Sequence, residues 1–152
     1  IDPVTLYLCE TTPLRPASLP RAQSYCIWEP LHIMREIWAA GGIQEPRIAL
    51  MHRVQTPKTA LLARSGDTPA GVGFLALDGE IAMLHAVEVL PSYRRRGVAK
   101  KLMAQAAKWA EDHGAKYMAL MTTRDNQAAN RLYSSLGMRP VGHYHYRIKD
   151  TA

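Results

Sequence analysis

The sequence predicts an α/β (α+β) domain in which helices cover both faces of a central, mixed sheet. Apolar runs that suit strands lie at 59–63, 71–77, 81–89 and 116–121. The first three runs are separated by residues 65–67 and 78–79, and the Asp-Gly pair at 78–79 is a strong hairpin signal. From Val98 onward, apolar residues recur at helical spacing as far as Trp109.

Capping and turn residues place the remaining elements. Further strands are expected at 3–8, 25–28 and 139–148. Helices are expected at 31–40, 44–52, about 95–113 and 126–136. The pair Gly41-Gly42 stops the first helix, Pro46 lies in the first turn of the second, and Gly114 suits a left-handed cap after the third.

Length and composition limit the class of protein. A chain of 152 residues suits one domain with its own core. No apolar run approaches the ~18–20 residues of a membrane span, and no signal peptide is visible, so no membrane partner is expected. Cys9 and Cys26 lack metal-ligand spacing. Neither a metal site nor a disulfide framework is therefore expected, and a cytoplasmic location fits.

The net charge of +6 is concentrated in one segment. Five of the basic residues lie within 94–101, where a phosphorylated ligand would account for them. Basic stripes interleaved with aromatic residues, which are typical of nucleic-acid surfaces, are absent. The sequence therefore predicts no nucleic-acid partner.

This basic segment has the order of an anion site, because a buried strand, a glycine-containing loop and the start of a helix follow one another. The first turn of a helix has backbone N–H groups without intrahelical partners, and its dipole adds positive charge. Gly97 and the small Ala99 allow close approach of a diphosphate. The candidate binding residues are Arg94, Arg95, Arg96, Gly97, Val98, Ala99 and Lys100, with Lys101 adding long-range attraction.

A second motif lies downstream, after the apolar strand 117–121. It runs from Asn126 through Tyr133 to Gly137-Met138. Together, the two motifs resemble the GNAT superfamily of acyl-CoA-dependent N-acyltransferases, over roughly residues 60–148. The resemblance implies that the segment 94–99 is the pyrophosphate loop for acetyl-CoA. It also implies that Asn126 contacts the pantetheine arm and that Tyr133 lies near the CoA sulfur.

The resemblance also sharpens the expected fold. GNAT members have a central, mixed, mostly antiparallel twisted sheet that is splayed between the fourth and fifth strands, with helices on both faces. The main chain of Val87, Glu88 and Val89 would pair with the pantetheine arm as a neighbouring strand does. The helical pair at 31–40 and 44–52 would cover the acceptor side of the sheet.

The resemblance to the family suggests candidates for proton transfer. Tyr133 would protonate the leaving thiolate as general acid, although a buried core tyrosine is the plain alternative. His85 and Glu88 are the candidates for removing a proton from the amine, and a core histidine and a salt-bridged carboxylate are their alternatives. Strict alternation places these two on opposite faces of the strand, whereas a bulge would change that parity.

The expected function is an N-acetyltransferase that transfers acetyl from acetyl-CoA to a primary amine by direct transfer in a ternary complex. The acceptor is a small molecule or an exposed protein or peptide amine. Met121 stands where the similar ribosomal-protein alanine acetyltransferases have a glutamate base, which weakens the peptide-amine subclass. The alternative is a catalytically weak, acyl-CoA-binding regulatory module. GNAT domains often pair through sheet edges, so a homodimer stays open.

The domain boundary is expected near residue 20. Residues 1–20 form an N-terminal strand and linker, and residues 21–152 form the acetyltransferase domain. The opening segment 1–7 shares a Pro-Val pair and a tyrosine with the segment 138–144 near the other end. We hypothesise that residues 1–9 are the tail strand of a preceding GNAT-like half; a chance match between two strands is the alternative.

Overall fold

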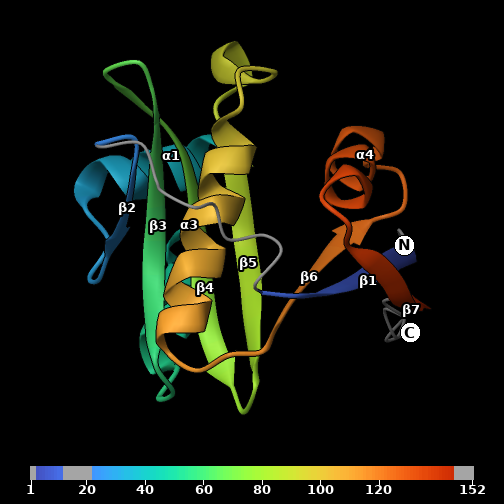
Figure 1. Cartoon of the computed structure of the whole chain (residues 1–152). Coiled ribbons are helices and arrows are strands. Elements are labelled where there is room, and N and C mark those ends of the chain that lie inside the picture. The colour runs from blue at the N-terminus through green and yellow to red at the C-terminus, as the bar shows by residue number, and fades with distance from the viewer. Residues whose placement is uncertain (1–2, 12–21, 146–152) are drawn as a thin grey trace, which may run out of the picture. The chain divides into compact units, whose positions relative to one another are not determined.

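The computed structural model describes residues 3–11 and 22–145 of the chain. These residues form seven strands, four α-helices and one 3-10 helix, which confirms the predicted α/β class (Figure 1). In chain order the elements are β1 (Pro3–Glu10), β2 (Ser24–Ile27), α1 (His32–Ala40), α2 (Glu45–Arg53), β3 (Lys58–Ser65), β4 (Thr68–Asp78), β5 (Ile81–Val89), the 3-10 helix (Pro91–Tyr93), α3 (Val98–Asp112), β6 (Tyr117–Thr123), α4 (Gln127–Ser135) and β7 (Arg139–His145). They belong to two compact units, one of residues 10–118 and one of residues 1–9 and 119–152.

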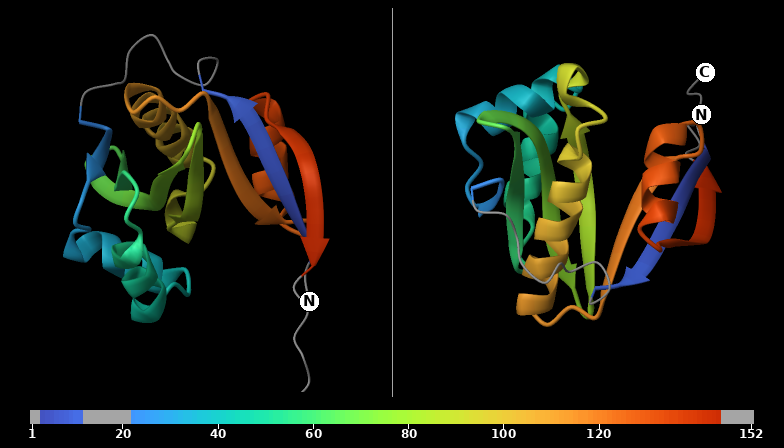
Figure 2. Two further views of the ribbon diagram at one scale, coloured as in Figure 1. Left: turned by 90° about the horizontal axis from the view of Figure 1, so that it is seen from below. Right: turned by 45° about the horizontal axis from the view of Figure 1, so that its top comes forward.

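The larger unit is a four-stranded antiparallel sheet with strand order β2-β3-β4-β5. Its two hairpin turns contain Gly66 and Gly79, both with positive φ, as the turn signals in the sequence predict. Helices α1 and α2 lie on one face of this sheet and α3 lies on the other (Figure 2). The predicted two-sided cover is therefore confirmed for this unit.

The core beneath α1 and α2 is built from large side chains that recur at helical spacing. Met34, Ile37 and Trp38 come from α1, and Ile48 and Met51 come from α2. They pack against the buried strand residues Ala60, Leu62, Val72 and Phe74. Trp38 is completely buried, so this layer fixes α1 tightly against β4 and β5.

Helix α3 packs against the other face through the stripe that begins at Val98 and Leu102. Both side chains are buried and both point at Gly71 of β4. The expected helix start near Arg95 is wrong by three residues, because α3 begins at Val98. The cause is local: Arg95 and Gly97 both have left-handed backbone conformations, which cannot continue a right-handed helix.

The smaller unit contains β6, β1 and β7, with strand order β6-β1-β7. Helix α4 lies along one face of these strands (Figure 2). Strand β1 pairs antiparallel with β7, from Pro3 opposite His145 to Leu8 opposite Arg139. The last three residues of the predicted closing strand, 146–148, lie outside the described residues, as does most of the predicted linker 11–20.

In the described part of the chain, each helix falls short of the length and apolarity that crossing a bilayer requires.

Candidate active site

The loop between β5 and α3 contains two residues in the left-handed backbone conformation. Arg95 has φ 63° and Gly97 has φ 77°, so these two residues flank Arg96 directly before α3. Gly97 is the N-cap of α3, and no side chain accepts a hydrogen bond there. The loop is exposed at its tip and anchored by the buried Val98.

The first turn of α3 leaves its amide groups available. The first helical bond runs from the Lys101 N–H to the Gly97 carbonyl oxygen over 3.1 Å. Among the described residues, no backbone acceptor outside the helix pairs with the N–H groups of Val98, Ala99 or Lys100. Uncapped amides at a helix N-terminus suit an anion, and a glycine N-cap adds no side chain that would block it. These residues therefore fit the diphosphate of a CoA ligand.

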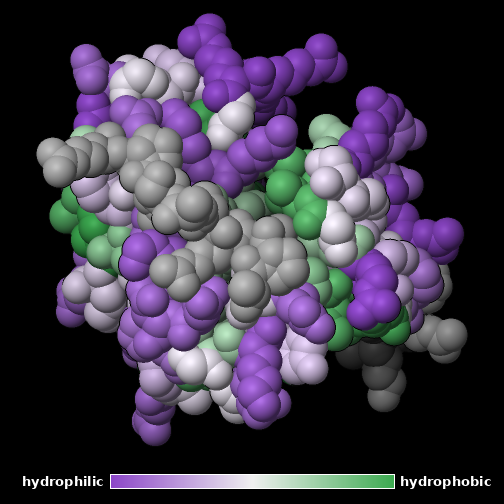
Figure 3. All heavy atoms as spheres, viewed as in Figure 1, coloured by the Kyte–Doolittle hydropathy of each residue, from purple (hydrophilic) through white to green (hydrophobic). Residues whose placement is uncertain are grey.

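The three arginines of the loop have different surroundings. The Arg94 Nε donates to the Val89 carbonyl oxygen over 3.4 Å, and the Arg96 guanidinium lies 5.4 Å from the centre of the Tyr93 ring. All three are exposed. Hydrophilic side chains gather over this loop, at the top of the space-filling view (Figure 3). The loop thus presents a cationic rim around the free amides.

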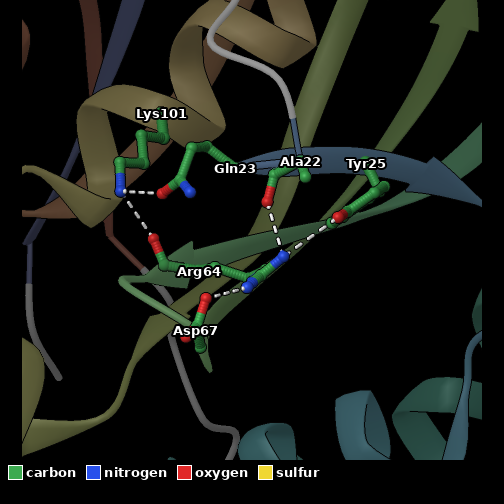
Figure 4. A network of polar contacts seen from close by, with 6 residues as sticks. All are labelled: Ala22, Gln23, Tyr25, Arg64, Asp67 and Lys101. Atoms are coloured by element: carbon green, nitrogen blue, oxygen red, sulfur yellow. Dashed lines mark hydrogen bonds and ion pairs between the residues drawn. The ribbon is translucent and has the colours of Figure 1, made fainter.

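Lys101 does not belong to that rim. Its ammonium group donates to the Gln23 Oε1 over 2.8 Å and to the Arg64 carbonyl oxygen over 2.7 Å (Figure 4). Arg64 in turn donates to the Ala22 carbonyl oxygen and to Asp67. Its ammonium group ties α3 to β3 and to the segment before β2, and the long-range attraction expected of its charge stays a prediction.

Strand β5 contains a bulge at Ala86. Val72 of β4 lies opposite Glu88, whereas Phe74 lies opposite His85, so β4 advances two residues while β5 advances three. Ala86 has φ 55°, a left-handed conformation that costs a non-glycine residue about 1–3 kcal/mol. The extra residue is unpaired in the ladder and resets the alternation of side chains.

The bulge brings His85 and Glu88 to the same face of the sheet. The His85 ring lies 6.2 Å from the ring of Phe74, a member of the core under α1 and α2. The Glu88 carboxyl group lies so close to Gly41, which follows α1, that a Cβ there would collide with it. Val87 instead lies 3.7 Å from where a Cβ of Gly73 would stand, on the α3 side with Leu84. The bulge that the resemblance raised is therefore present.

The electrostatic surroundings tune both groups. Burial lowers the pKa of the His85 imidazole, and the Arg47 guanidinium lowers it further. Burial raises the pKa of the Glu88 carboxyl group, and Arg94 and Arg47 oppose that rise. The pKa values of the two groups thus differ by less than those of the free side chains. The imidazole is neutral near pH 7.

Arg47 was not among the residues that the sequence singled out. It lies in the first half of α2, next to the buried Ile48, and its charge acts on both His85 and Glu88. The only sequence signal for it is its place on a helix expected to cover the acceptor side. Its effects on the pKa values of His85 and Glu88 follow only from the packing of α2 on the sheet.

In the smaller unit, Asn126 is the N-cap of α4. Its side-chain oxygen accepts a hydrogen bond from the Ala129 N–H over 3.1 Å. One turn later, the Asn130 amide donates to the carbonyl oxygens of Thr123, Arg124 and Asn126. The Tyr7 hydroxyl donates to the Asn130 Oδ1 over 2.6 Å. The capping role that the sequence allowed for Asn126 is present, and Asn130 was a residue that the sequence did not single out.

Tyr133 is buried in the same unit. Its ring centroid lies 5.7 Å from that of Tyr7. Burial, with a smaller contribution from Tyr7, raises the pKa of Tyr133 to about 12. The phenol is therefore protonated at neutral pH and is a weaker acid than a free tyrosine.

Curated relatives of this chain are named N-acetyltransferases. It is 26% identical over 100 residues to an uncharacterized N-acetyltransferase of Bacillus subtilis. The alignment covers 66% of this chain and 40% of that protein. It is also 29% identical over 120 residues to an aminoglycoside N(6')-acetyltransferase type 1 of Klebsiella aerogenes. That alignment covers 70% of this chain and 78% of that protein. The chain spans about two fifths of the length of the first curated relatives that it matches.

Solved structures share the fold at low sequence identity. A functionally unknown conserved protein from Staphylococcus epidermidis superposes with a TM-score of 0.70 at 14% identity, over 93% of this chain and 59% of that one. An aminoglycoside N-acetyltransferase in complex with CoA superposes with a TM-score of 0.64 at 20% identity, over 84% of this chain and 98% of that one.

The model of the acetyltransferase (GNAT) family matches residues 26–138, a range that contains the arginine-glycine loop, the bulged strand and the helix that carries Tyr133. The chain belongs to the GNAT acetyltransferase family.

Proposed function

We propose that this chain is an N-acetyltransferase that moves the acetyl group of acetyl-CoA directly to a primary amine. The observation that carries the proposal is the start of α3, where uncapped amide groups follow the left-handed Gly97 inside a cationic loop. Family membership and the CoA complex of a structurally similar aminoglycoside N-acetyltransferase support it.

The residues that would hold the cofactor fall into three groups. The N–H groups of Val98, Ala99 and Lys100 would bind the diphosphate, with Gly97 allowing its approach. Arg94, Arg95, Arg96 and the Lys100 side chain would attract its negative charge. The main chain of Val87, Glu88 and Val89 would pair with the pantetheine arm, and Asn126 would contact the same arm. Acetyl-CoA would supply the acetyl group as a thioester.

The amine would be activated on the α1 and α2 face of β5. A protonated amine must lose a proton before it can attack, and a neutral imidazole accepts one near neutral pH. His85 is the base that we favour, because the ordinary pKa of an imidazole lies above that of a carboxyl group and nearer to neutral pH. Glu88 would then hold the positive charge of the incoming amine.

Tyr133 would donate the proton that the departing sulfur needs. With a pKa of about 12, its hydroxyl carries the proton at neutral pH. In the smaller unit the Tyr7 ring supports the Tyr133 ring, so the position of the hydroxyl is set by packing.

The acceptor class is a small-molecule primary amine or an exposed protein or peptide amine. Several curated relatives are named aminoglycoside N(6')-acetyltransferases, which places amino sugars among the acceptors to test first. The exposed Met121 offers no carboxylate, so we keep peptide amines as the weaker subclass.

We also propose that residues 1–9 are the tail strand of a preceding GNAT-like half. In the smaller unit β1 lies between β6 and β7 in strand order and pairs antiparallel with β7. A tandem GNAT protein from the clavulanic acid biosynthesis pathway superposes on 94% of this chain over 51% of its own length, with a TM-score of 0.67 at 14% identity. Sequencing the native gene upstream of Ile1 tests this, and a start codon directly before it would contradict the proposal.

A thiol-release assay tests the enzymatic function. Wild-type protein is incubated with acetyl-CoA and a panel of amino sugars, amino acids and peptides, and free CoA thiol is measured. Release that depends on one acceptor class supports the proposal. Tight CoA binding without release from any acceptor would favour the alternative, a regulatory acyl-CoA-binding module. Failure to bind CoA in calorimetry would contradict both.

A further inference from the structure

The β5 bulge receives a hydrogen bond from outside the sheet. The Trp38 Nε1 donates to the Ala86 carbonyl oxygen over 2.8 Å. Trp38 lies on α1, which covers the sheet face, and a carbonyl in the β4–β5 ladder would instead point along the sheet toward its neighbouring strand. The Ala86 carbonyl is therefore turned toward α1, where the indole N–H supplies its hydrogen bond.

Trp38 is suited to hold this conformation. Its side chain is completely buried, and it packs in the same core as Ile37 and Phe74. A buried indole N–H requires an acceptor, just as a buried bulge carbonyl requires a donor, so each satisfies the other. Ala86 adopts φ 55° without being glycine, so the surroundings must stabilise the left-handed backbone that the residue itself disfavours.

The C-terminal end of the same helix also leaves space for the Glu88 side chain, which the bulge directs to this face of the sheet. Gly41 follows three residues after Trp38, and the Glu88 carboxyl group fills the space that a side chain at position 41 would need. One end of α1 thus fixes the bulge through Trp38 and accommodates Glu88 through Gly41. The bulge in turn sets His85 and Glu88 on one face.

We propose that Trp38 is a positioning residue for acetyl transfer, which holds the β5 bulge through the Ala86 carbonyl and so keeps His85 and Glu88 together on the acceptor face. This inference rests on the proposed function, because it takes that face to be the acceptor side. Without the indole donor, β5 relaxes toward regular pairing, and regular alternation would turn one of the two groups away.

The test is Trp38→Phe, which keeps an aromatic ring and removes the donor. We expect kcat to fall on the order of 10-fold to 100-fold, as for a reacting group displaced by about 1 Å, while the KM for acetyl-CoA stays within about twofold. Adding Ala86→Gly should recover most of kcat, since glycine adopts the left-handed conformation without help. A folded Trp38→Phe protein with unchanged kcat, or a loss that Ala86→Gly fails to recover, would overturn the proposal.

A control variant separates the positioning role of Trp38 from core packing, and a second variant at position 38 replaces Trp38→Phe if that protein does not fold. Ile37→Val removes a methyl group from the neighbouring buried position and keeps the hydrogen bond, so kcat should stay within about twofold of wild type. If Trp38→Phe does not fold, 3-benzothienylalanine at position 38 alone preserves the ring shape and places sulfur where the N–H stands. The same loss of kcat is expected, and full activity of that protein would overturn the proposal.

A measurement that needs no acceptor separates this inference from the proposed function. The Arg47 guanidinium of α2 lowers the pKa of His85. Glu88 lies on the same strand face, and both Arg47 and Arg94 lower its pKa against the effect of burial. In Trp38→Phe, whichever of the His85 imidazole and the Glu88 carboxyl group turns away should titrate closer to its ordinary pKa, as followed by NMR, and in Ile37→Val both should titrate as in wild type. If wild-type protein transfers no acetyl group, the proposed function fails while this titration still decides the role of Trp38. Unmoved titration of both His85 and Glu88 in Trp38→Phe would overturn that role.

Discussion

Gly71 of β4 and Val98 of α3 are in such close contact that a Cβ on Gly71 would stand 2.6 Å from the Val98 Cγ1. The same Cβ would lie 3.2 Å from the Leu102 Cδ1. Gly71 therefore lets the first turn of α3, with its free amide groups, pack directly on the sheet. The position of the proposed diphosphate site depends on this missing side chain.

Gly71→Ala should displace the start of α3. We expect the free energy of unfolding to fall by about 1–3 kcal/mol from overpacking. CoA affinity should fall about tenfold, which corresponds to about 1.4 kcal/mol, because the amides no longer point at one place. Calorimetry and thermal unfolding measure both. The control is Gly73→Ala on the same strand, whose Cβ would meet Leu84 at an ordinary 3.4 Å; equal loss of affinity in the control would contradict the explanation.

Gly97→Val should remove CoA binding. A β-branched residue at φ 77° is strained, and its side chain would occupy the approach to the amides. We expect affinity in calorimetry to fall at least about 100-fold, or about 2.8 kcal/mol. Gly79→Val is the matched control, since Gly79 has φ 59° and open space around it but lies in the turn before β5. It should lose comparable stability and keep its affinity. Normal CoA affinity of Gly97→Val would rule out the loop assignment.

The pH dependence of acetyl transfer should identify the base. Burial lowers the pKa of His85, so the imidazole stays neutral, and able to accept a proton, down to a lower pH than a free histidine. We expect kcat/KM to fall as the pH drops through that lowered pKa, which gives the profile an acidic limb. We expect His85→Gln to reduce kcat/KM by about 10²–10⁴-fold and to abolish this acidic limb. Glu88→Gln should keep the limb. The reverse pattern in the two variants would assign the base to Glu88.

Arg47→Ala should move the same acidic limb. The guanidinium lowers the pKa of both His85 and Glu88, so its removal raises both, and activity is lost at a higher pH than in wild type. The direction is the same for either base. Arg53→Ala removes a positive charge from the last turn of α2 and should leave the limb in place. A limb that stays put in Arg47→Ala would show that Arg47 does not act on the base.

Tyr133→Phe should separate chemistry from binding. It removes the proposed proton donor and keeps the ring that packs against Tyr7, so kcat should fall by about 10²-fold while the affinity for CoA and the midpoint of unfolding stay close to wild type. With a pKa of about 12, Tyr133 should add no basic limb to the wild-type profile below about pH 11. Tyr117→Phe removes a half-buried phenol from the first residue of β6 as a control. Unchanged turnover in Tyr133→Phe would remove this residue from the mechanism.

The sequence by itself determined the features that short-range spacing controls. The hairpin turns at Gly66 and Gly79, the loop before α3 and the N-cap at Asn126 all depend on a few consecutive residues, because turn geometry and helix ends are set by local backbone preferences. The loop motif also has a fixed place between a buried strand and a helix. These local patterns were sufficient for the fold class and for the family.

Tertiary structure alone decided how those pieces meet. Whether His85 and Glu88 share a face depends on a bulge at Ala86, and the conformation of Ala86 depends on Trp38, which is 48 residues away in the chain. In the same way, Lys101 looks like part of the basic loop in the sequence but donates to Arg64 and Gln23 in the structure. Residue spacing specifies a strand or a helix end, but the register of neighbouring strands and the partner of a buried polar group are set only when distant segments pack.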